Sequence, residues 1–325
     1  MQEAEVLMLE REHGGRGELL QFEGFGNKDV YNPAVVDIHG KRVMVGRWES
    51  RNNQTDSDVG FGIVNDTTVT RLEGISLEKP DRLTYEDPRM TFIKGEIVLG
   101  VVRVDWNPKG KHGSGDTRYD ALGTLFFRGK TLEELRPFTE GPPEMKDICL
   151  IDLGEQGIGF YGRPHPDITF GRIGSLDDLK AKAIDAAPVL KGLRDPGDPE
   201  WVGGNVAYRW DEQTNLLLFH RGSKDSAGVV DYRAEWVLHN FVTGEVSEPQ
   251  VLATRDDFED GPVKETPPGL QNIAFPSALL TDFDGPFLKD FRGMFDLYAG
   301  LSDASVGVKR IPSGLFVASS KRLAA

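Results

Sequence analysis

The sequence predicts an all-β protein, a five-bladed β-propeller that forms a single domain over residues 1–325, with one short helix after the third blade. Hairpins with alternating apolar and polar residues recur five times, and the 38 glycines and 19 prolines are spread along the chain as many turns require. The hairpin turns centre near Gly40, Gly95, Glu155, Gln213 and Gly293. Successive turns lie 55, 60, 58 and 80 residues apart, which is a repeat long enough for about four strands. A pair of β-sandwiches is the alternative for the same pattern.

Each repeat begins with a hairpin. The paired strands are expected at 35–38 with 42–45, 90–93 with 97–99, 148–151 with 158–161, 206–210 with 216–219, and 278–280 with 294–298. Further alternating stretches follow at 59–64, 122–127 and 232–238. The loop 257–269 lengthens the last repeat.

Helical signals are few. The capping-box sequence Ser175-Leu176-Asp177-Asp178 predicts a helix through about Leu190, and residues 131–135 predict one helical turn. Either residues 6–9 or residues 314–317 are expected to form the strand that closes the ring of blades.

Composition limits the function classes. The net charge of -14, from 38 basic and 52 acidic residues, argues against a nucleic-acid partner. No apolar run approaches the roughly 18 residues of a membrane helix, and the acidic start lacks a secretory signal, so we expect a soluble, cytoplasmic protein without a membrane partner. Cys149 is the only cysteine, and its apolar neighbours predict a buried strand position.

Charged residues recur where the second strand of each hairpin ends. Arg47, Arg103, Arg163 and His220 lie 7, 8, 8 and 7 residues beyond their turn centres. Equivalent positions in successive blades face one axis, so these side chains are expected to line a pocket that suits a polyhydroxylated substrate and an anion. The alternative is that strand ends are polar because they meet solvent.

Several short motifs occur in a fixed order along nearly the whole chain. They are Tyr31-Asn32-Pro33-Ala34 before Arg47-Trp48-Glu49-Ser50-Arg51; Glu86-Asp87-Pro88-Arg89; Lys146-Asp147 before Arg163-Pro164; Phe219-His220-Arg221-Gly222 before Tyr232-Arg233; and Phe275-Pro276 before Leu297-Tyr298-Ala299-Gly300-Leu301-Ser302-Asp303. In these motifs the chain resembles the β-mannoside phosphorylases, a glycoside hydrolase family of five-bladed propellers, and their relatives the mannogen β-1,2-mannosyltransferase-phosphorylases. Arg221, residues 105–107 and residues 112–116 depart from that pattern.

The resemblance implies an inverting phosphorylase that acts on β-mannosides, with β-1,2-linked manno-oligosaccharides expected, and that uses inorganic phosphate or mannose 1-phosphate. Asp87 would be the general acid, acting through the mannosyl 3-hydroxyl. Phosphate would be held by Lys146, Arg163, His220 and Tyr232. The sugar would be held by Asn32, Arg47, Glu49, Arg51, Arg89, Arg103 and Asp303. Burial or the neighbouring Glu86 would raise the pKa of Asp87, whereas Arg89 would lower it.

Three other functions stay open. An inverting hydrolase would use Glu49 or Asp303 as base. A GDP-mannose-dependent mannosyltransferase would use Asp56-Ser57-Asp58 to bind a metal, and a non-catalytic propeller would bind glycans through its tryptophans. We expect carbohydrate and phosphate as partners, no metal and no cofactor beyond phosphate; a homo-oligomer is left open.

Overall fold

Antiparallel strands dominate the computed structural model, which describes residues 15–51, 53–80, 82–107, 109–112, 118–164, 167–193, 200–265, 267–283 and 285–317. The first group of strands is β2 (Gln21–Glu23), β3 (Asp29–Ile38), β4 (Lys41–Ser50), β5 (Asn53–Asn65) and β6 (Thr68–Arg71). The second is β7 (Leu83–Ile93), β8 (Glu96–Trp106), β9 (Tyr119–Gly129) and β10 (Arg136–Pro143). The third is β11 (Cys149–Asp152), β12 (Ile158–Gly162) and β13 (Thr169–Ile173).

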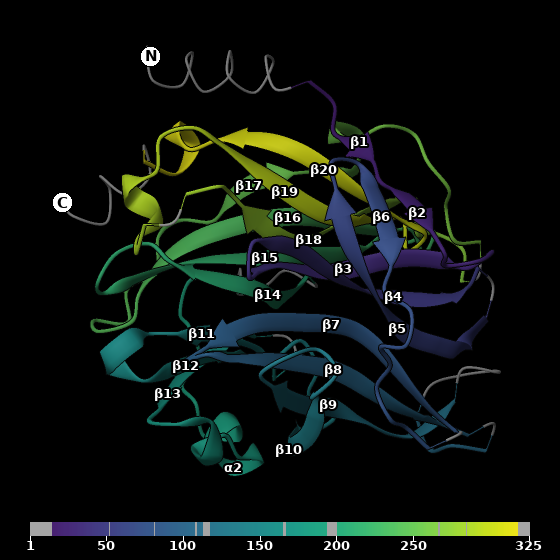
Figure 1. Cartoon of the computed structure of the whole chain (residues 1–325), viewed down its shortest axis with the longest axis horizontal. Coiled ribbons are helices and arrows are strands. Elements are labelled where there is room, and N and C mark those ends of the chain that lie inside the picture. Colours follow the sequence, from purple (N-terminus) through teal and green to yellow (C-terminus); the bar gives the residue numbers. More distant parts are fainter. Residues whose placement is uncertain are drawn as a thin grey trace.

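The fourth and fifth groups complete the fold (Figure 1). They contain β14 (Trp201–Arg209), β15 (Thr214–Lys224), β16 (Val230–Asn240) and β17 (Gln250–Ala253), then β18 (Asn272–Leu280), β19 (Met294–Leu301) and β20 (Ser305–Pro312). A short parallel pairing of β16 with β18 joins these two groups. The N-terminal β1 (Glu18–Leu19) pairs with β20, and β2 pairs in parallel with β6, so this segment ties the last group to the first.

The five predicted hairpins are confirmed. They are β3 with β4, β7 with β8, β11 with β12, β14 with β15, and β18 with β19. The first strands of the groups contact each other in cyclic order, β3 to β7, β7 to β11, β11 to β14, β14 to β18, and β18 back to β3. All five also line one small internal cavity, so these strands surround a common centre.

Bulges interrupt the first strands near this centre. The register shifts between Tyr31 and Ala34 in β3 and between Glu86 and Arg89 in β7, and similar shifts occur in β14 and β18. A bulge re-aims the side chains it contains. Asn32 and Asp87 lie in these bulges with φ of 43° and 42°, a left-handed conformation that Asn and Asp tolerate better than most residues.

The helical predictions need three corrections. The capping box at Ser175 is present, but the helix expected through Leu190 is reduced to η2 (Leu176–Asp178) and α2 (Ala181–Asp185), because Leu179 and Lys180 between them are extended. Residues 131–135 form bends and turns without a helix. Residues 314–317 are helical, and the expected strand at 6–9 lies outside the described residues.

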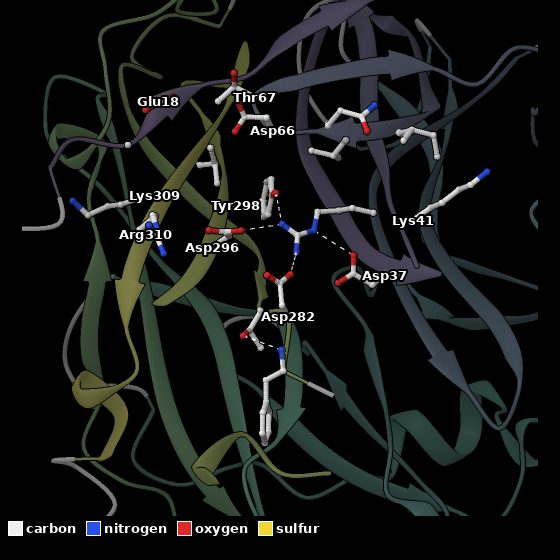
Figure 2. Close-up of a pocket in the computed structure, with 18 of the residues that line it drawn as sticks. Glu18, Asp37, Lys41, Asp66, Thr67, Asp282, Asp296, Tyr298, Lys309 and Arg310 are labelled. Atoms are coloured by element: carbon white, nitrogen blue, oxygen red, sulfur yellow. Dashed lines mark hydrogen bonds and ion pairs between the residues drawn. The ribbon is translucent and has the colours of Figure 1, made fainter. Parts of the chain in front are cut away.

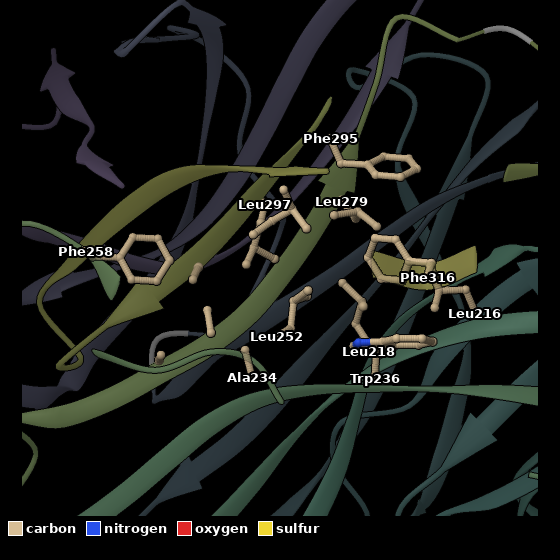
Figure 3. Packing of buried hydrophobic residues seen from close by; sticks show 14 of the residues in the cluster. Leu216, Leu218, Ala234, Trp236, Leu252, Phe258, Leu279, Phe295, Leu297 and Phe316 are labelled. Atoms are coloured by element: carbon tan, nitrogen blue, oxygen red, sulfur yellow. The ribbon is translucent and has the colours of Figure 1, made fainter. Parts of the chain in front are cut away.

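Aromatic residues fill the space between the fourth and fifth groups (Figure 3). Trp236 and Phe316 are both 0% exposed, with ring centroids 4.8 Å apart, and Phe295 packs edge-on against Phe316. Burying Phe316 explains why residues 314–317 turn inward as a helix rather than extend as an edge strand. Trp236 is therefore a core residue and presents no surface for a sugar.

Two further expectations concern Cys149 and membrane-spanning helices. Cys149 is buried in β11 as predicted. Within the part of the chain that the structure describes, no helix is long and apolar enough to cross a membrane.

Candidate active site

Four carboxyl groups gather around Arg47 of β4. We call them the acidic cluster: Glu49, Glu86, Asp87 and Asp303. Arg47 donates from Nε and Nη2 to Glu49 Oε2, both at 2.9 Å, and its Nη1 lies 3.1 Å from Glu86 Oε2 and 3.6 Å from Asp87 Oδ1. Arg47 is 6% exposed, so water screens these interactions only weakly. One guanidinium thus holds carboxylates from β4 and β7 together.

The two bulges bring Asn32 and Asp87 face to face. Asn32 donates from Nδ2 to Asp87 Oδ1 at 3.0 Å. Gly300 of β19 makes room for this contact, because a Cβ at that position would lie 2.1 Å from Asn32 Oδ1. The Asp87 side chain is 12% exposed, so the group predicted to be the general acid lies in a largely enclosed site.

Lys264, in the loop between β17 and β18, contacts the acidic cluster. It belongs to none of the sequence motifs that predicted the site. Lys264 is 1% exposed, and its ammonium group donates to Glu49 Oε1 and to the Tyr31 hydroxyl, the latter at 3.1 Å. Tyr31 in turn donates to Glu49 Oε1 at 2.6 Å. Both oxygens of Glu49 are therefore occupied, one by Arg47 and one by Lys264 and Tyr31.

Two members of the acidic cluster have carboxyl groups that titrate near neutral pH. Burial, and then the charges of Asp87 and Glu49, raise the pKa of Glu86 to about 7 against the opposing charge of Arg47. Burial likewise raises the pKa of Asp303 to about 6, although Arg47 and Lys264 oppose the shift.

Three cations lie beside the acidic cluster around a buried carboxylate. We call Arg89, Lys146 and Arg163 the basic cluster. Asp147, 3% exposed, accepts a hydrogen bond from Arg89 Nη2 at 2.9 Å on one oxygen and from Arg163 Nη1 on the other. Burial alone would raise the pKa of Asp147, but Arg163 and Arg89 lower it well below its usual range. Three cations thus face one permanent negative charge.

His220 and Tyr232 form the wall next to the basic cluster. His220 of β15 is 1% exposed, its ring stacks on Tyr232 at a centroid distance of 5.0 Å, and Phe275 packs against it at 4.7 Å. Burial, reinforced by Arg163, lowers the pKa of His220 well below its usual value. Burial also raises the pKa of Tyr232 to about 12, so both side chains are neutral at pH 7.

The two clusters meet at β7. Asp87 and Arg89 are two residues apart, and Arg89 Nη1 donates to the Asp87 carbonyl at 3.0 Å. Lys146 is close enough to act electrostatically on both Glu86 and His220. A substrate that reached Asp87 would therefore be next to the basic cluster.

Arg103 lies outside the pocket in which the sequence predicts it. Strand pairing resumes after the bulges at Ala34 with Val45, Arg89 with Gly100, and Val206 with Leu218; in the third group, whose hairpin has no register shift, pairing begins at Cys149 with Tyr161. Two residues beyond these partners lie Arg47, Val102, Arg163 and His220. Arg103 is one residue further and so faces the opposite side of its sheet. It pairs there with Glu140 at 2.8 Å.

Arg51 also lies at the margin of the site. Its side chain is 47% exposed, and it donates to both oxygens of Asp29 from Nε and Nη2. The structure thus brings together Asn32, Arg47, Glu49, Asp87 and Asp303 on one side and Arg89, Lys146, Arg163, His220 and Tyr232 on the other. Of the predicted residues, Arg51 is at the rim and Arg103 is outside.

Among the described residues, no group of three or more His, Cys, Asp or Glu side chains could hold a metal ion. Asp56 lies 3.3 Å from Lys28, and Asp58 lies 2.9 Å from Lys79, so each aspartate of the Asp-x-Asp triplet already has a cationic partner.

A separate hollow of about 1020 Å³ lies between the first and fifth groups (Figure 2). Arg42 crosses it and is held by Asp37 at 3.2 Å, Asp296 at 2.9 Å and the Tyr298 hydroxyl at 3.2 Å. None of the predicted site residues lines this hollow. Despite its size, it does not contain the chemistry that the motifs predicted.

Solved structures share this fold. MPT-4 from Leishmania mexicana, a mannose phosphorylase in complex with a phosphate ion, has a TM-score of 0.77 at 24% identity, over 97% of this chain and 95% of that one. MPT-1 from the same organism, a GDP-Man-dependent mannosyltransferase, has 0.77 at 27% identity over 94% of each chain. The β-1,2-mannobiose phosphorylase from Listeria innocua has 0.62 at 15% identity, over 91% of this chain and 94% of that one.

These matches confirm the relation predicted from the motifs, to a class of nearly all-β proteins that includes mannoside phosphorylases and mannosyltransferases. Residues 9–313 match the profile of a family described as "Protein of unknown function (DUF1861)", and the chain belongs to that family. Comparison with curated protein sequences gives no match.

Proposed function

We propose that the chain is an enzyme that transfers a mannosyl unit reversibly between a β-mannoside, of the β-1,2-linked manno-oligosaccharide class, and inorganic phosphate. Inversion at the anomeric carbon would give α-mannose 1-phosphate. The fold proposed for it is one five-bladed β-propeller domain over residues 1–325. The cyclic contacts of β3, β7, β11, β14 and β18 support that fold, and the solved relatives support the reaction class.

The observation that carries the proposal is the charge of the basic cluster. Arg89, Lys146 and Arg163 together outweigh Asp147 by two positive charges, in a chain whose net charge is -14. Guanidinium groups bind phosphate oxygens well, and clustered buried cations need an anion to balance them. An anion there would lie beside Asp87, where phosphate could attack a sugar held by the acidic cluster.

Each cluster then has a part in the reaction. A phosphate oxygen attacks the anomeric carbon from the face opposite the leaving group, and the bond from that carbon to the glycosidic oxygen breaks. Asp87 gives its proton to the mannosyl 3-hydroxyl, whose own proton passes to the leaving oxygen. Arg47 and Asn32, which both contact Asp87 Oδ1, keep the carboxyl in place.

The hydrolase alternative loses one of its two candidate bases. A general base needs a free carboxylate oxygen near water, whereas Glu49 is 0% exposed and both its oxygens are occupied. Asp303 is half-buried and would be the remaining candidate base.

A GDP-mannose-dependent transferase is the second candidate, because MPT-1 is 27% identical to this chain over 94% of its length. The same acidic cluster would hold the mannosyl group, and the basic cluster would hold a diphosphate leaving group. The two donors, mannose 1-phosphate and GDP-mannose, distinguish the proposals.

The test is donor use in the synthetic direction. The purified protein is incubated with mannose and either mannose 1-phosphate or GDP-mannose. We expect release of inorganic phosphate and formation of a β-mannoside with mannose 1-phosphate. Turnover with GDP-mannose alone would favour the transferase, and turnover with neither donor would contradict both.

A further inference from the structure

The pair His220 and Asn205 fixes which ring nitrogen carries a proton. Asn205 Oδ1 accepts a hydrogen bond from the backbone N–H of His220 at 3.1 Å and lies 2.8 Å from His220 Nδ1. A backbone N–H only donates, so the side-chain atom facing it is the amide oxygen. That oxygen only accepts, and therefore Nδ1 of the imidazole carries the hydrogen.

The opposite edge of the ring has no such partner. No described residue forms a hydrogen bond with His220 Nε2. The Cε1–Nε2 edge of the ring lies against Gly203. A Cβ atom on residue 203 would be 2.3 Å from His220 Cε1, 2.8 Å from His220 Nε2 and 3.2 Å from Arg163 Cδ. Glycine at 203 therefore lets the ring edge approach the Arg163 side chain of the basic cluster.

The charges around the ring keep it neutral. Arg163, Arg89 and Lys146 act on His220 from three positions, Asp147 opposes them, and the stacked Tyr232 is uncharged at pH 7. Burial and the three cations lower the pKa of His220 well below its usual value. With the hydrogen on Nδ1, the lone pair is on Nε2, so the ring offers an acceptor beside the cations of the basic cluster.

We propose that His220 Nε2 accepts a hydrogen bond from a hydroxyl of the bound oxyanion, so that the site selects phosphate or arsenate, which carry a proton, over sulfate, which carries none. This rests on the proposed function, because it assigns the anion of that reaction to the basic cluster. His220 is then a specificity-determining residue and not simply another cation.

Charge and shape alone would not make this selection. Doubly charged phosphate and sulfate are both tetrahedral and carry the same charge, so the basic cluster attracts them equally. They differ in one hydrogen. A sulfate oxygen placed against Nε2 sets two lone pairs against each other and leaves a buried acceptor unsatisfied, which weakens binding.

The first test measures anion binding without turnover. Calorimetric titration of the wild-type protein with inorganic phosphate alone, and then with sulfate alone, gives two dissociation constants. We expect phosphate to bind at least about tenfold more tightly, the effect of one buried hydrogen bond gained or lost. Equal affinities, or tighter sulfate binding, would overturn the proposal.

The matched variant is Asn205→Asp. It keeps the side-chain shape and both accepted hydrogen bonds, but its charge favours the imidazolium, so Nε2 becomes a donor. We expect the preference for phosphate over sulfate to fall by about tenfold in this variant. His39→Asn, in the exposed β3–β4 turn, is the control and should keep the wild-type preference. An unchanged preference in Asn205→Asp would contradict the account.

The tautomer can be read directly by nitrogen NMR of histidine-labelled protein, with His220→Gln to assign the signal. We expect a neutral ring with hydrogen on Nδ1, and a shift of the Nε2 signal when phosphate binds. A charged ring, or hydrogen on Nε2, would overturn the proposal even if Asn205→Asp fails to fold. Selective phosphate binding with phosphate-independent cleavage of mannosides would instead retain this inference and refute the proposed function.

Discussion

The acidic and basic clusters adjoin each other but differ in how their charges are balanced. In the acidic cluster, four carboxyl groups surround Arg47 and Lys264, and two of them have pKa values raised to about 7 and about 6. In the basic cluster, three cations surround Asp147, whose pKa is lowered. One side can therefore hold and release protons near neutral pH, and the other keeps a fixed excess of positive charge.

This difference assigns to separate clusters the two functions that a phosphorylase needs, proton transfer and binding of the nucleophilic anion. Proton transfer to a leaving sugar requires a carboxyl group in an enclosed site, whereas a nucleophilic anion requires cations that do not titrate. A hydrolase needs only the first. Variants that change one cluster and leave the other intact therefore test whether the assignment is right.

The largest effect is expected for Asp87→Asn, which breaks the acidic cluster at its proton donor. The amide keeps the shape but has no acidic proton, so kcat should fall by about a thousandfold or more while phosphate still binds. Activity and calorimetric phosphate titration measure the two parts. Asp282→Asn, in the separate hollow, is the control; a folded Asp87→Asn protein with wild-type turnover would remove Asp87 from the mechanism.

Lys264→Met tests what holds the acidic cluster together. It leaves Arg47 as the remaining cation beside the buried Glu49 and only the Tyr31 hydroxyl on Oε1, so the free energy of unfolding should fall by about 1–3 kcal/mol. Denaturant titration measures this loss. Lys264→Met combined with Glu49→Gln should recover part of it, because a neutral side chain at position 49 loses less than a carboxylate when the ammonium group is absent. A change below about 1 kcal/mol in the single variant would mean that Lys264 is not structurally coupled to Glu49.

Arg163→Ala and Lys146→Ala change the basic cluster alone. Removing one charged hydrogen bond to phosphate should raise the KM for phosphate by about tenfold or more and affect mannoside binding less. Arg103→Ala is the matched control, since Arg103 pairs with Glu140 away from the site. Equal effects of Arg163→Ala and Arg103→Ala on the KM for phosphate would contradict the assignment of Arg163 to the anion site and of Arg103 to the outside of it.

Glu86→Gln probes the pH response of the acidic cluster. The pKa of Glu86 is 4.5 in an ordinary environment and about 7 in the folded protein, so the native state retains a proton that the unfolded chain releases between these values. Its contribution to stability is complete below pH 4.5 and is lost as pH rises through about 7. The slope can reach about 1.4 kcal/mol per pH unit.

Glu86→Gln cannot lose a proton, so its free energy of unfolding should fall less steeply over this pH window. Asp303 contributes in the same direction up to about pH 6, so some slope will remain. Denaturant titrations of both proteins at several pH values give the comparison. Parallel curves would show that Glu86 is not the titrating group.

The smallest effect is expected from chelation. EDTA should leave the activity unchanged, since Asp56 and Asp58 are paired with lysines and no metal cluster occurs among the described residues. Activity lost in EDTA and restored by manganese would contradict this and favour the nucleotide-sugar transferase.

The five hairpins could be predicted from the sequence because their strands are alternating or continuous apolar runs on either side of a turn. The site was harder to place because it depends on exceptions to the period. The distance of Arg103 from its turn predicts that it lines the pocket. Arg103 is one residue beyond the position equivalent to Arg47, however, so its side chain lies on the opposite face of the sheet.

Lys264 carried no signal in the sequence motifs. Lys264 comes from an irregular loop, and its partners Tyr31 and Glu49 lie more than two hundred residues earlier, so only the folded chain brings them together. Asn205 had a weak signal, as a polar residue inside an apolar strand. The pKa of Glu86 depends on burial, which no motif reports.

The most direct measurement is the initial rate of β-mannoside cleavage with and without inorganic phosphate, with the products identified. The account predicts negligible cleavage in phosphate-free buffer, and α-mannose 1-phosphate as the product when phosphate is present. Equal rates in both buffers, with free mannose as the product, would show that the protein is a hydrolase and that the basic cluster does not bind the nucleophile.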